Sequence, residues 1–438
     1  MQHDMSWTRR HFLHVGAAGC AVSVSGWLGK LALAAGRDPN RKRSCILLWM
    51  NGGPATIDLW DLKPGHANGG PYKEIATKAP GLKIGEHLPK LAGWGDRLAV
   101  IRSMATKEGD HGRASYLLRT GNLPLGGIDF PTLGSLVAKE LHRDGGDLPP
   151  FVSIAAQRIL AQNAFGPGFL GPQYAPLFVA DGQRSANDSG GVDRQLKVEN
   201  LDRYAEVTPE RGDRRLKLMK SLESDFLHDH PGSIAGSHQA AYAAALRIMK
   251  TETAQVFDLS NEKAQLRDRY GRNLFGQGCL LARRLVERGV PFVEVTLDGW
   301  DTHQANFDGV KNLCGVLDPA WSTLMADLQE RGLLESTLIV CMGEFGRTPK
   351  INPQKGRDHF PNVWSAVLAG GGIKGGQAIG RSSKDGMQVE GKAHSVPDLL
   401  ATVCHALGID CEKQNMSNVG RPIRIVDKAG APITEVLA

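Results

Sequence analysis

The sequence lacks the features of a disulfide-rich, nucleic-acid-binding or multi-domain protein. Its 7 cysteines include no Cys-x-x-Cys pair, which excludes the usual zinc-finger and thioredoxin-like spacings. The formal net charge is only +6, and basic residues alternate with acidic ones, as between residues 194 and 215. No one-sided basic block therefore predicts binding to nucleic acid. No Pro/Ser-rich linker, internal repeat or low-complexity tract divides the chain, which favours a single domain.

The N-terminus has the pattern of an export signal. The pair Arg9-Arg10 precedes an apolar segment from residue 15 to about residue 33. This segment ends in Ala32-Leu33-Ala34, which has the small-residue pattern of a signal-peptide cleavage site. This order predicts that residues 1–34 are a twin-arginine signal peptide. Cargo of this route folds before it crosses the membrane, often because a metal or cofactor is loaded in the cytoplasm. A metal site is therefore worth seeking in the rest of the chain.

Two other interpretations of the N-terminus fit less well. A permanent membrane anchor is disfavoured because the segment is short and contains Ser23, Ser25 and Lys30. A lipid-attachment box ending at Cys20 is weaker still, because few apolar residues precede it. Residues 35–438 are thus expected to form the mature domain, in the periplasm or another extracytoplasmic compartment, with membrane contact only during export.

Short apolar runs of strand length alternate with helical patterns along the chain. Continuous apolar runs suit strands buried on both faces of a parallel sheet, and they lie at 44–50, 98–101, 291–297, 337–342 and 365–369. Helical spacing covers 276–288 and 319–330, and glycine follows each segment. We therefore predict an α/β fold with a mostly parallel, doubly wound sheet flanked by helices. The polar, helical stretch 190–275 is expected to be a helical insertion.

Polar side chains lie beside several of these runs, where such a sheet binds its ligands. The candidates are Asn51, Asp58, Asp298, Asp301, His303, Glu344, Arg347, Arg357 and His359. Carboxylates and imidazoles that converge from separate strand ends are what a divalent metal site requires. Any one of them alone is more often a helix cap or a loop residue. Asp301 and His303 are a better pair, because residues two apart in an extended segment point the same way.

Four motifs carry a family resemblance. They are Asn-Gly-Gly-Pro-Ala-Thr-Ile-Asp at 51–58, Asp-Gly-Trp-Asp-Thr-His at 298–303, Gly-Glu-Phe-Gly-Arg-Thr-Pro at 343–349 and Gly-Arg-Asp-His-Phe-Pro at 356–361. In this order they resemble the alkaline phosphatase and sulfatase superfamily, and more closely the exported, sulfatase-like family called domain of unknown function fifteen-oh-one. The resemblance extends from about Ser44 to Leu407, and it implies a sulfatase-like domain over residues 35–438.

The resemblance implies a divalent metal ion, which could be zinc, calcium or magnesium. The ligands that it implies for a first ion are Asp298 or Asp301, His303 and His359. For a second ion, Asn51 stands where the superfamily has an aspartate, and Glu344-Phe345 stands where it has an Asp-His pair. Asp58 and Glu344 could still hold a hard cation through their oxygens.

The segment His111-Gly-Arg-Ala-Ser-Tyr-Leu-Leu-Arg-Thr-Gly121 resembles the sulfatase motif that opens with a Cys or Ser oxidised to formylglycine. His111 takes that position, and no cysteine lies between Cys45 and Cys279, so formylglycine is not expected. His111 is instead expected to be a further metal ligand, a general acid or base, or a nucleophile, oriented by Asp110. Weaker nucleophile candidates are Ser103, Thr106 and Ser115.

Basic residues lie near these candidates in the sequence and suit an anionic substrate. A guanidinium group can donate two parallel hydrogen bonds to the oxygens of a sulfate or phosphate group. We count Arg113 and Arg347, with His111 and Asp110, as catalytic candidates, while Lys350 and Arg357 also lie nearby in the sequence. The predicted function is an exported, metal-dependent hydrolase of phosphate or sulfate esters, or of a related anionic small molecule or glycan. The alternatives are a catalytically retired protein that binds anionic glycans and an envelope assembly partner.

Changing Arg9→Lys together with Arg10→Lys should leave the precursor in the cytoplasm, because twin-arginine recognition requires both guanidinium groups. Cell fractionation followed by immunoblotting measures the distribution. A matched control changes Arg37→Lys and Arg41→Lys, just beyond the predicted signal, and should export normally. Normal levels of exported mature protein from the Arg9/Arg10 variant would contradict the signal assignment.

Overall fold

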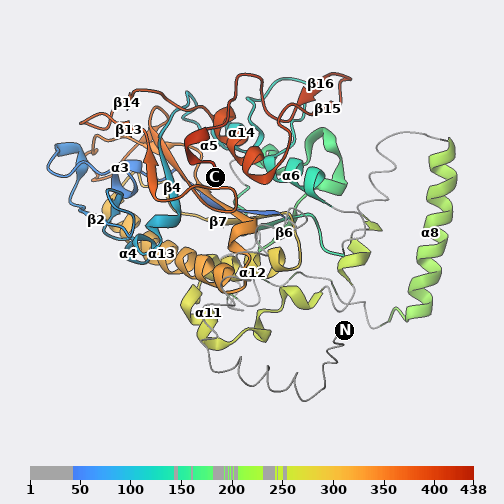
Figure 1. The fold of residues 1–438 in the computed structure, drawn as a ribbon. Coiled ribbons are helices and arrows are strands. Elements are labelled where there is room, and N and C mark those ends of the chain that lie inside the picture. The colour runs from blue at the N-terminus through green and yellow to red at the C-terminus, as the bar shows by residue number, and fades with distance from the viewer. Residues whose placement is uncertain are drawn as a thin grey trace, which may run out of the picture.

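The computed structural model describes residues 43–142, 147–158, 161–180, 206–229 and 254–438, with a few short pieces between 192 and 249. Its centre is an eight-stranded sheet with the order β12-β4-β11-β8-β1-β7-β5-β6 (Figure 1). The strands are β1 (Ser44–Met50), β4 (Leu98–Met104), β5 (Phe151–Ile154), β6 (Leu177–Val179), β7 (Phe292–Leu297), β8 (Thr337–Met342), β11 (Trp364–Gly370) and β12 (Gln377–Ile379). The five predicted strands are all present, and the mostly parallel α/β fold is confirmed.

One strand of the sheet runs against the others. β11 is antiparallel to both β8 and β4, whereas β8, β1, β7, β5 and β6 pair in parallel, as do β4 and β12. The beginning of β11 therefore lies at the edge where its neighbours end. For this reason the segment before β11 reaches the same edge as the segments that follow β1, β7 and β8.

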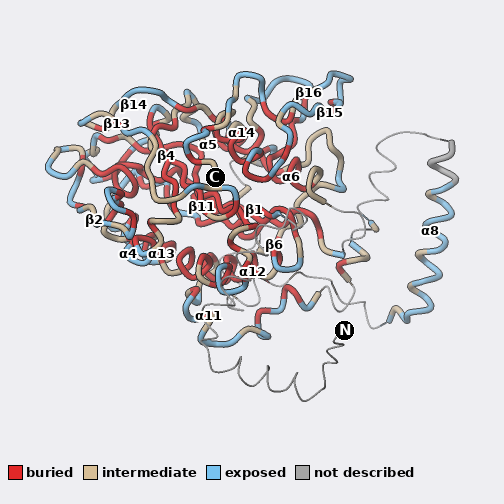
Figure 2. The backbone as a smooth tube through the Cα atoms, in the orientation of Figure 1, coloured by how far each residue is buried: buried red, intermediate tan, exposed pale blue. Residues whose placement is uncertain are grey.

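Helices cover both faces of the sheet (Figure 1). Alternate residues of β1 enter two different cores: Ile46, Leu48 and Met50 face one, and Cys45, Leu47 and Trp49 face the other. The first core includes α12 (Leu274–Glu287) and α13 (Asn306–Glu330), and the second includes α6 (Leu133–Leu141) and α14 (Val396–Leu407). Figure 2 shows the buried backbone concentrated at these strands and helices. Burial on both faces explains the continuous apolar runs.

The two helices predicted between the strands exist, but one is longer than its pattern indicated. α12 spans Leu274–Glu287 and ends before Gly289, whose φ is 85°. α13 begins at Asn306, although the spacing predicted a helix only from Pro319. That prediction rested on the helical spacing of apolar residues such as Leu324 and Leu328. In the structure Pro319 lies inside the helix.

Smaller elements complete the described chain. The other helices are α3 (Thr56–Leu59), α4 (Pro89–Ala92), α5 (His111–Thr120), α8 (Pro209–Asp229) and α11 (Ala264–Tyr270). Short two-stranded sheets pair β2 (Glu74–Ala76) with β3 (Lys83–Gly85), β9 (Gly346–Arg347) with β10 (His359–Phe360), β13 (Arg381–Ser382) with β14 (Val389–Glu390), and β15 (Gln414–Met416) with β16 (Pro422–Arg424).

The predicted domain boundaries stay predictions. The proposed signal peptide, residues 1–34, lies outside the described residues. The expected insertion, residues 190–275, contains the helices α8 and α11. Much of the remainder of this segment also lies outside the residues that the structure describes. α8 is drawn apart from the main body, and its Leu218 and Leu222 are each 62% exposed (Figure 1). Among the described helices, none combines the length and apolar character needed to span a bilayer.

A buried ion pair joins α5 to the sheet. Arg119, near the end of α5, donates to the Glu294 carboxylate on β7, and both side chains are almost fully buried. The guanidinium group also lies 4.1 Å from the ring centres of Trp49 and Phe165. Because α5 begins with His111 and β7 leads to Asp301, this pair ties together two elements that carry candidate site residues.

Arg119→Met should lower the free energy of unfolding by about 3–5 kcal/mol, because it leaves the Glu294 carboxylate buried without its partner. Chemical denaturation measures the effect. The matched control is Arg113→Met, which removes an exposed arginine from the same helix and should change stability little. Equal stabilities for the two variants would show that the Arg119–Glu294 pair does not anchor α5.

Candidate metal centre

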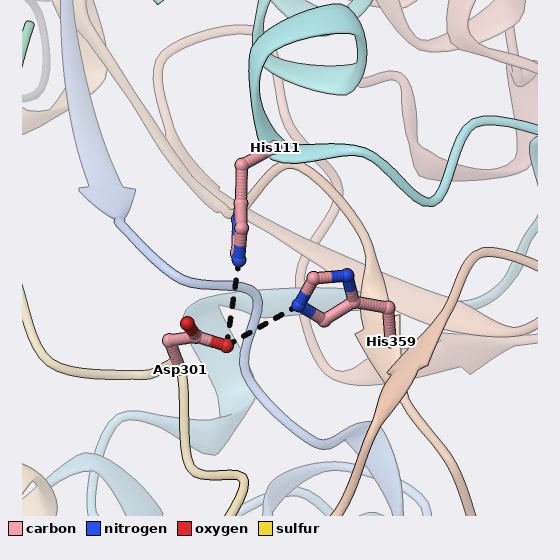
Figure 3. A group of neighbouring side chains, drawn as sticks. All are labelled: His111, Asp301 and His359. Carbon is pink, nitrogen blue, oxygen red and sulfur yellow. Dashed lines mark hydrogen bonds and ion pairs between the residues drawn. The ribbon is translucent and has the colours of Figure 1, made fainter. Parts of the chain in front are cut away.

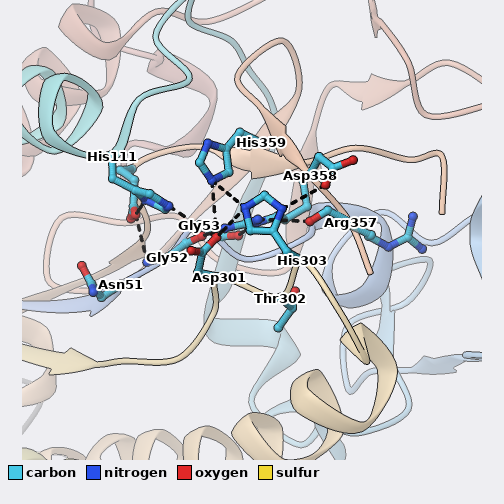
Figure 4. Close-up of polar contacts among 12 residues, drawn as sticks. Asn51, Gly52, Gly53, His111, Asp301, Thr302, His303, Arg357, Asp358 and His359 are labelled. Atoms are coloured by element: carbon cyan, nitrogen blue, oxygen red, sulfur yellow. Dashed lines mark hydrogen bonds and ion pairs between the residues drawn. The ribbon is translucent and has the colours of Figure 1, made fainter. Parts of the chain in front are cut away.

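Four segments bring candidate side chains to the carboxyl edge of the sheet (Figure 4). His111 is the first residue of α5, which follows β4, and Asp301 lies in the loop after β7. Arg347 lies in β9, after β8, and His359 lies in β10, before β11. The short β9–β10 pairing places Arg347 directly opposite His359. The antiparallel direction of β11 thus accounts for the presence of His359 here.

The carboxylate oxygen Oδ1 of Asp301 is the centre of the cluster. It lies 3.4 Å from Nε2 of His111, 3.4 Å from Nε2 of His359 and 3.1 Å from Nε2 of His303. Figure 3 shows the rings of His111 and His359 approaching this oxygen from different segments. One ligand atom each from His111, Asp301 and His359 lies within 4.8 Å of the other two. Within the described part of the chain, this is the one such group of metal-ligating side chains.

The tautomers of two histidines follow from their outer contacts. Nδ1 of His111 lies 2.6 Å from Oε1 of Glu344, and Nδ1 of His359 lies 2.7 Å from the carbonyl oxygen of Gly109. A carboxylate or a carbonyl oxygen accepts hydrogen bonds, so each Nδ1–H donates. In the neutral form of each ring, Nε2 then carries a lone pair that faces Asp301. Metal-ligating histidines show this arrangement, in which the outer nitrogen donates to an oxygen.

His303 repeats the pattern at the edge of the cluster. Its Nδ1 lies 2.9 Å from Oδ1 of Asp358, and its Nε2 faces both Asp301 and His359 (Figure 4). The two Nε2 atoms of His303 and His359 are only 3.0 Å apart. With both Nδ1 atoms donating elsewhere, two lone pairs face each other beside a carboxylate. Such an arrangement requires a proton or a cation between the groups.

The cluster therefore fits a metal ion by the chemistry of its donors. Nε2 of His111 is buried and has no hydrogen-bond partner in the described structure. The cluster supplies imidazole nitrogens and a carboxylate oxygen, which together are a typical ligand set for zinc and other transition metals. His111, Asp301 and His359 could hold such an ion, and His303 lies close enough to complete a set of four.

Arg347 fixes the central carboxylate. Its fully buried guanidinium group forms an ion pair with Asp301 and donates to the carbonyl oxygens of Gly52 and Gly53. For this contact, the turn after β1 must lie very close to the backbone of the loop that carries Asp301. A Cβ atom on Gly52 would lie 2.3 Å from the backbone nitrogen of Asp301, and its φ is 110°, so the position requires glycine. Arg347 is thus a positioning residue whose side chain faces the protein interior.

The charges of the cluster shift its pKa values in different directions. Burial lowers the pKa of His111, but the hydrogen bond and charge of Glu344 and the charge of Asp301 outweigh it, so the net pKa is raised. Burial lowers the pKa of His359, and the nearby charge of Arg347 adds to that decrease. Burial raises the pKa of Asp301, yet the hydrogen bond and charge of Arg347 reverse the shift and lower it. Asp301 is therefore held as a carboxylate.

Other predicted ligands lie in different surroundings. Asp58 is buried and forms a two-point ion pair with Arg357, at 2.8 and 2.9 Å, and also accepts from Asn306 at 2.7 Å. The oxygens of Asp58 are therefore engaged by Arg357 and Asn306, whereas the sequence predicted that they hold a second ion. Asn51 donates to Oδ1 of Asp298 at 2.7 Å, and neither belongs to the group around Asp301.

Glu344 acts through another residue. Its Oε1 accepts from the backbone nitrogen of Gly52 at 2.9 Å and from Nδ1 of His111. Glu344 is thus the group that orients His111, a role that the sequence had predicted for Asp110. Asp110 instead caps α5 by accepting from the backbone nitrogen of Arg113. Arg113 is half-exposed, and its guanidinium group pairs with Glu108 at 2.8 and 3.0 Å.

These observations define an α/β protein with a histidine and carboxylate cluster at the carboxyl edge of its sheet. The sequence profile of one family, described as "Protein of unknown function (DUF1501)", matches residues 42–437. The chain belongs to this family, as its motifs predicted. No curated protein matches the chain.

Solved structures resemble this fold at low sequence identity. The PsFucS1 sulfatase from Pseudoalteromonas sp. is 15% identical with a TM-score of 0.39, covering 88% of this chain and 72% of that one. The lipoteichoic acid synthase LtaP from Listeria monocytogenes is 10% identical with a TM-score of 0.38, covering 87% and 78%. A protein in the alkaline phosphatase superfamily from Vibrio parahaemolyticus is 11% identical with a TM-score of 0.37, covering 87% and 75%.

Asp301→Asn should remove most of the metal-binding capacity, because it takes the charge from the centre of the cluster. Asp58→Asn should leave metal stoichiometry unchanged and lower the free energy of unfolding by about 3–5 kcal/mol, because Arg357 loses its buried partner. Metal analysis after reconstitution and chemical denaturation measure the two effects. Loss of metal from folded Asp58→Asn protein would restore Asp58 as a ligand.

Proposed function

We propose that the protein is a metal-dependent hydrolase of phosphate or sulfate esters, or of a related anionic ester, that acts after export. The observation that carries the proposal is the convergence of three histidine Nε2 atoms on Oδ1 of Asp301. Each imidazole has its other nitrogen beside an oxygen acceptor. The arrangement supports a single ion held by His111, Asp301 and His359, with His303 as a fourth ligand.

The donor set favours zinc or a similar transition metal over calcium or magnesium. Three nitrogens and one oxygen match the preferences of zinc, whereas calcium and magnesium prefer oxygen ligands. Bound in this position, such an ion supplies Lewis-acid polarisation of a phosphoryl or sulfuryl oxygen. Its charge also favours an anionic substrate, because Asp301 is already balanced by Arg347.

His111 serves better as a ligand than as a nucleophile. Its Nδ1 is engaged by Glu344, and its Nε2 faces Asp301 within the cluster. Neither nitrogen is then free to attack an ester, so we assign the attack to water rather than to His111. The substrate approaches from the side of His303, which is 44% exposed and whose ring is held by Asp358. Oxygens of the anionic group can contact the cluster on that open side.

Arg347 does not bind the substrate in this proposal, because its side chain is fully buried among backbone carbonyl oxygens. It holds Asp301 in place and limits the negative charge of the site. Among the sequence-predicted catalytic candidates, His111 is therefore assigned to the metal and Arg347 to positioning. Asp110 caps α5, and Arg113 lies outside the cluster.

His111→Ala and His359→Ala should each reduce bound metal to a small fraction of one ion per chain and lower turnover in proportion. The double variant should lose little more than either single variant, because the residues share one ion. Metal analysis after reconstitution with zinc, manganese, magnesium or calcium measures binding, and a panel of phosphate and sulfate esters measures activity. The control is His405→Ala, an exposed histidine of α14, which should retain both.

The outcomes separate the proposed enzyme from its alternatives. Wild-type protein that binds no metal after reconstitution, or single-variant losses that simply add, would contradict the shared site. Metal binding without turnover of any ester would contradict the hydrolase and favour a retired, anion-binding protein.

A further inference from the structure

A pair of cysteines at the end of α14 has no part in the metal centre. The structure describes six cysteines, and five of them are buried: Cys45, Cys279, Cys314, Cys341 and Cys404. The sixth, Cys411, is partly exposed. Cys404 is only 1% exposed and packs in the core that contains α14, seven positions before Cys411 in the sequence. An accessible thiol and a buried thiol therefore belong to one short segment.

The turn that ends α14 folds the chain back so that Cys411 lies against the helix. Gly408 has a φ of 73°, and the backbone nitrogen of Ile409 donates to the carbonyl oxygen of Cys404 at 2.8 Å, which is the Schellman arrangement. Sγ of Cys411 then lies 3.7 Å from the carbonyl oxygen of Ala401, one turn before Cys404. A helical side chain extends over the turn that precedes it, so Sγ of Cys404 is directed to the same place.

The segment that carries Cys411 is held in this position by its backbone. The carbonyl oxygen of Cys411 accepts from the backbone nitrogen of Val426 at 3.2 Å. The carbonyl oxygen of Lys413 accepts from Ile425 at 2.9 Å. Val426 and Ile425 are buried in the same core as Cys404. The approach of the two thiol groups is therefore part of the packed structure.

A hydrogen bond between the two thiol groups makes them chemically unequal. It lowers the pKa of Cys411, and it outweighs the opposing effects of burial and of the Asp410 charge. The same hydrogen bond, together with burial, raises the pKa of Cys404. The thiolate is the reactive form of cysteine, so Cys411 reacts first. An accessible thiol of low pKa beside a second thiol is the arrangement of redox-active cysteines.

We propose that Cys404 and Cys411 are a redox site that closes to a disulfide bond in an oxidising compartment. The bond joins the end of α14 to the segment that leads into β15. Export, as the N-terminal sequence predicts, would carry the folded and still reduced protein into such a compartment. The proposal requires neither the metal ion nor hydrolysis.

The reaction needs an oxidant that carries a disulfide bond, such as oxidised glutathione or a disulfide-donating protein. The Cys411 thiolate attacks one sulfur of that bond, forms a mixed disulfide and releases the first oxidant thiolate, which takes up a proton. Cys404 then loses its proton, attacks the Cys411 sulfur and displaces the second oxidant thiolate, which takes up that proton. Two cysteine thiols are oxidised to one disulfide, and one disulfide of the oxidant is reduced to two thiols.

The first step of this reaction favours the second. While Cys411 is a thiolate, its hydrogen bond and its negative charge both raise the pKa of Cys404. The Cys411 sulfur has no charge in the mixed disulfide, so both of these effects are removed. Cys404 then loses its proton more readily, beside the sulfur that it must attack.

Peptide mapping by mass spectrometry tests the proposal on the full chain, with Cys20→Ser to remove the thiol of the predicted signal. The protein is purified with a reductant, equilibrated with an excess of oxidised over reduced glutathione, and alkylated after unfolding. We expect one disulfide, between Cys404 and Cys411, and alkylation of the other four cysteines. Free thiols at both positions, or a disulfide between another pair such as Cys45 and Cys404, would overturn the proposal.

Two variants test the order of attack. Cys404→Ser should accumulate a glutathione adduct on Cys411, because no second thiol displaces it. Cys411→Ser should leave Cys404 unmodified, because that thiol is buried and its pKa is raised. The matched control, Cys314→Ser, removes a buried cysteine of α13 and should form the disulfide as the parent chain does. An adduct on Cys404 but none on Cys411 would overturn the assignment of Cys411 as the reactive thiol.

Discussion

The crowding of hydrogen-bond acceptors around Asp301 is the constraint on which the site depends. Three imidazole nitrogens face one carboxylate oxygen, and two of those nitrogens, on His303 and His359, are 3.0 Å apart. Arg347 supplies one positive charge, but it is buried behind the carboxylate and fully engaged. Positive charge is needed between the imidazoles as well. A proton or a cation between the rings would supply it, and a divalent ion, as we propose, would find the rings already oriented by their outer hydrogen bonds.

The fold gathers these groups through two unusual features of the sheet. One is the reversed direction of β11, which brings His359 to the edge where β7 and β8 end. The other is the close approach of the turn at Gly52 to Asp301, which admits no side chain and allows Arg347 to bind carbonyl oxygens on that turn. The Arg119–Glu294 pair adds a third link, between α5 and β7. The site therefore depends on contacts among segments far apart in the sequence.

The sequence predicted the parts of this structure that depend on local pattern. Strands such as β1 were visible because burial on both faces leaves a continuous apolar run, and the positions of Asp301 and His359 beside strands marked them as candidates. Side-chain partners were not predictable. Asp58 was predicted as a ligand, but in the structure it pairs with Arg357, which is 299 residues away in the sequence. Likewise, Glu344, the partner of His111, is 233 residues away from it. No local signal encodes such tertiary pairings, so the roles of individual carboxylates could not be assigned.

The central claim is that one metal ion binds between His111, Asp301 and His359. A crystal structure of the zinc-loaded protein, with anomalous data collected on both sides of the zinc absorption edge, tests it most directly. The account predicts one strong anomalous peak about 2.0–2.2 Å from Nε2 of His111, Nε2 of His359 and Oδ1 of Asp301. A peak held instead by Asp298 and Asn51, or no peak at this edge of the sheet, would contradict it.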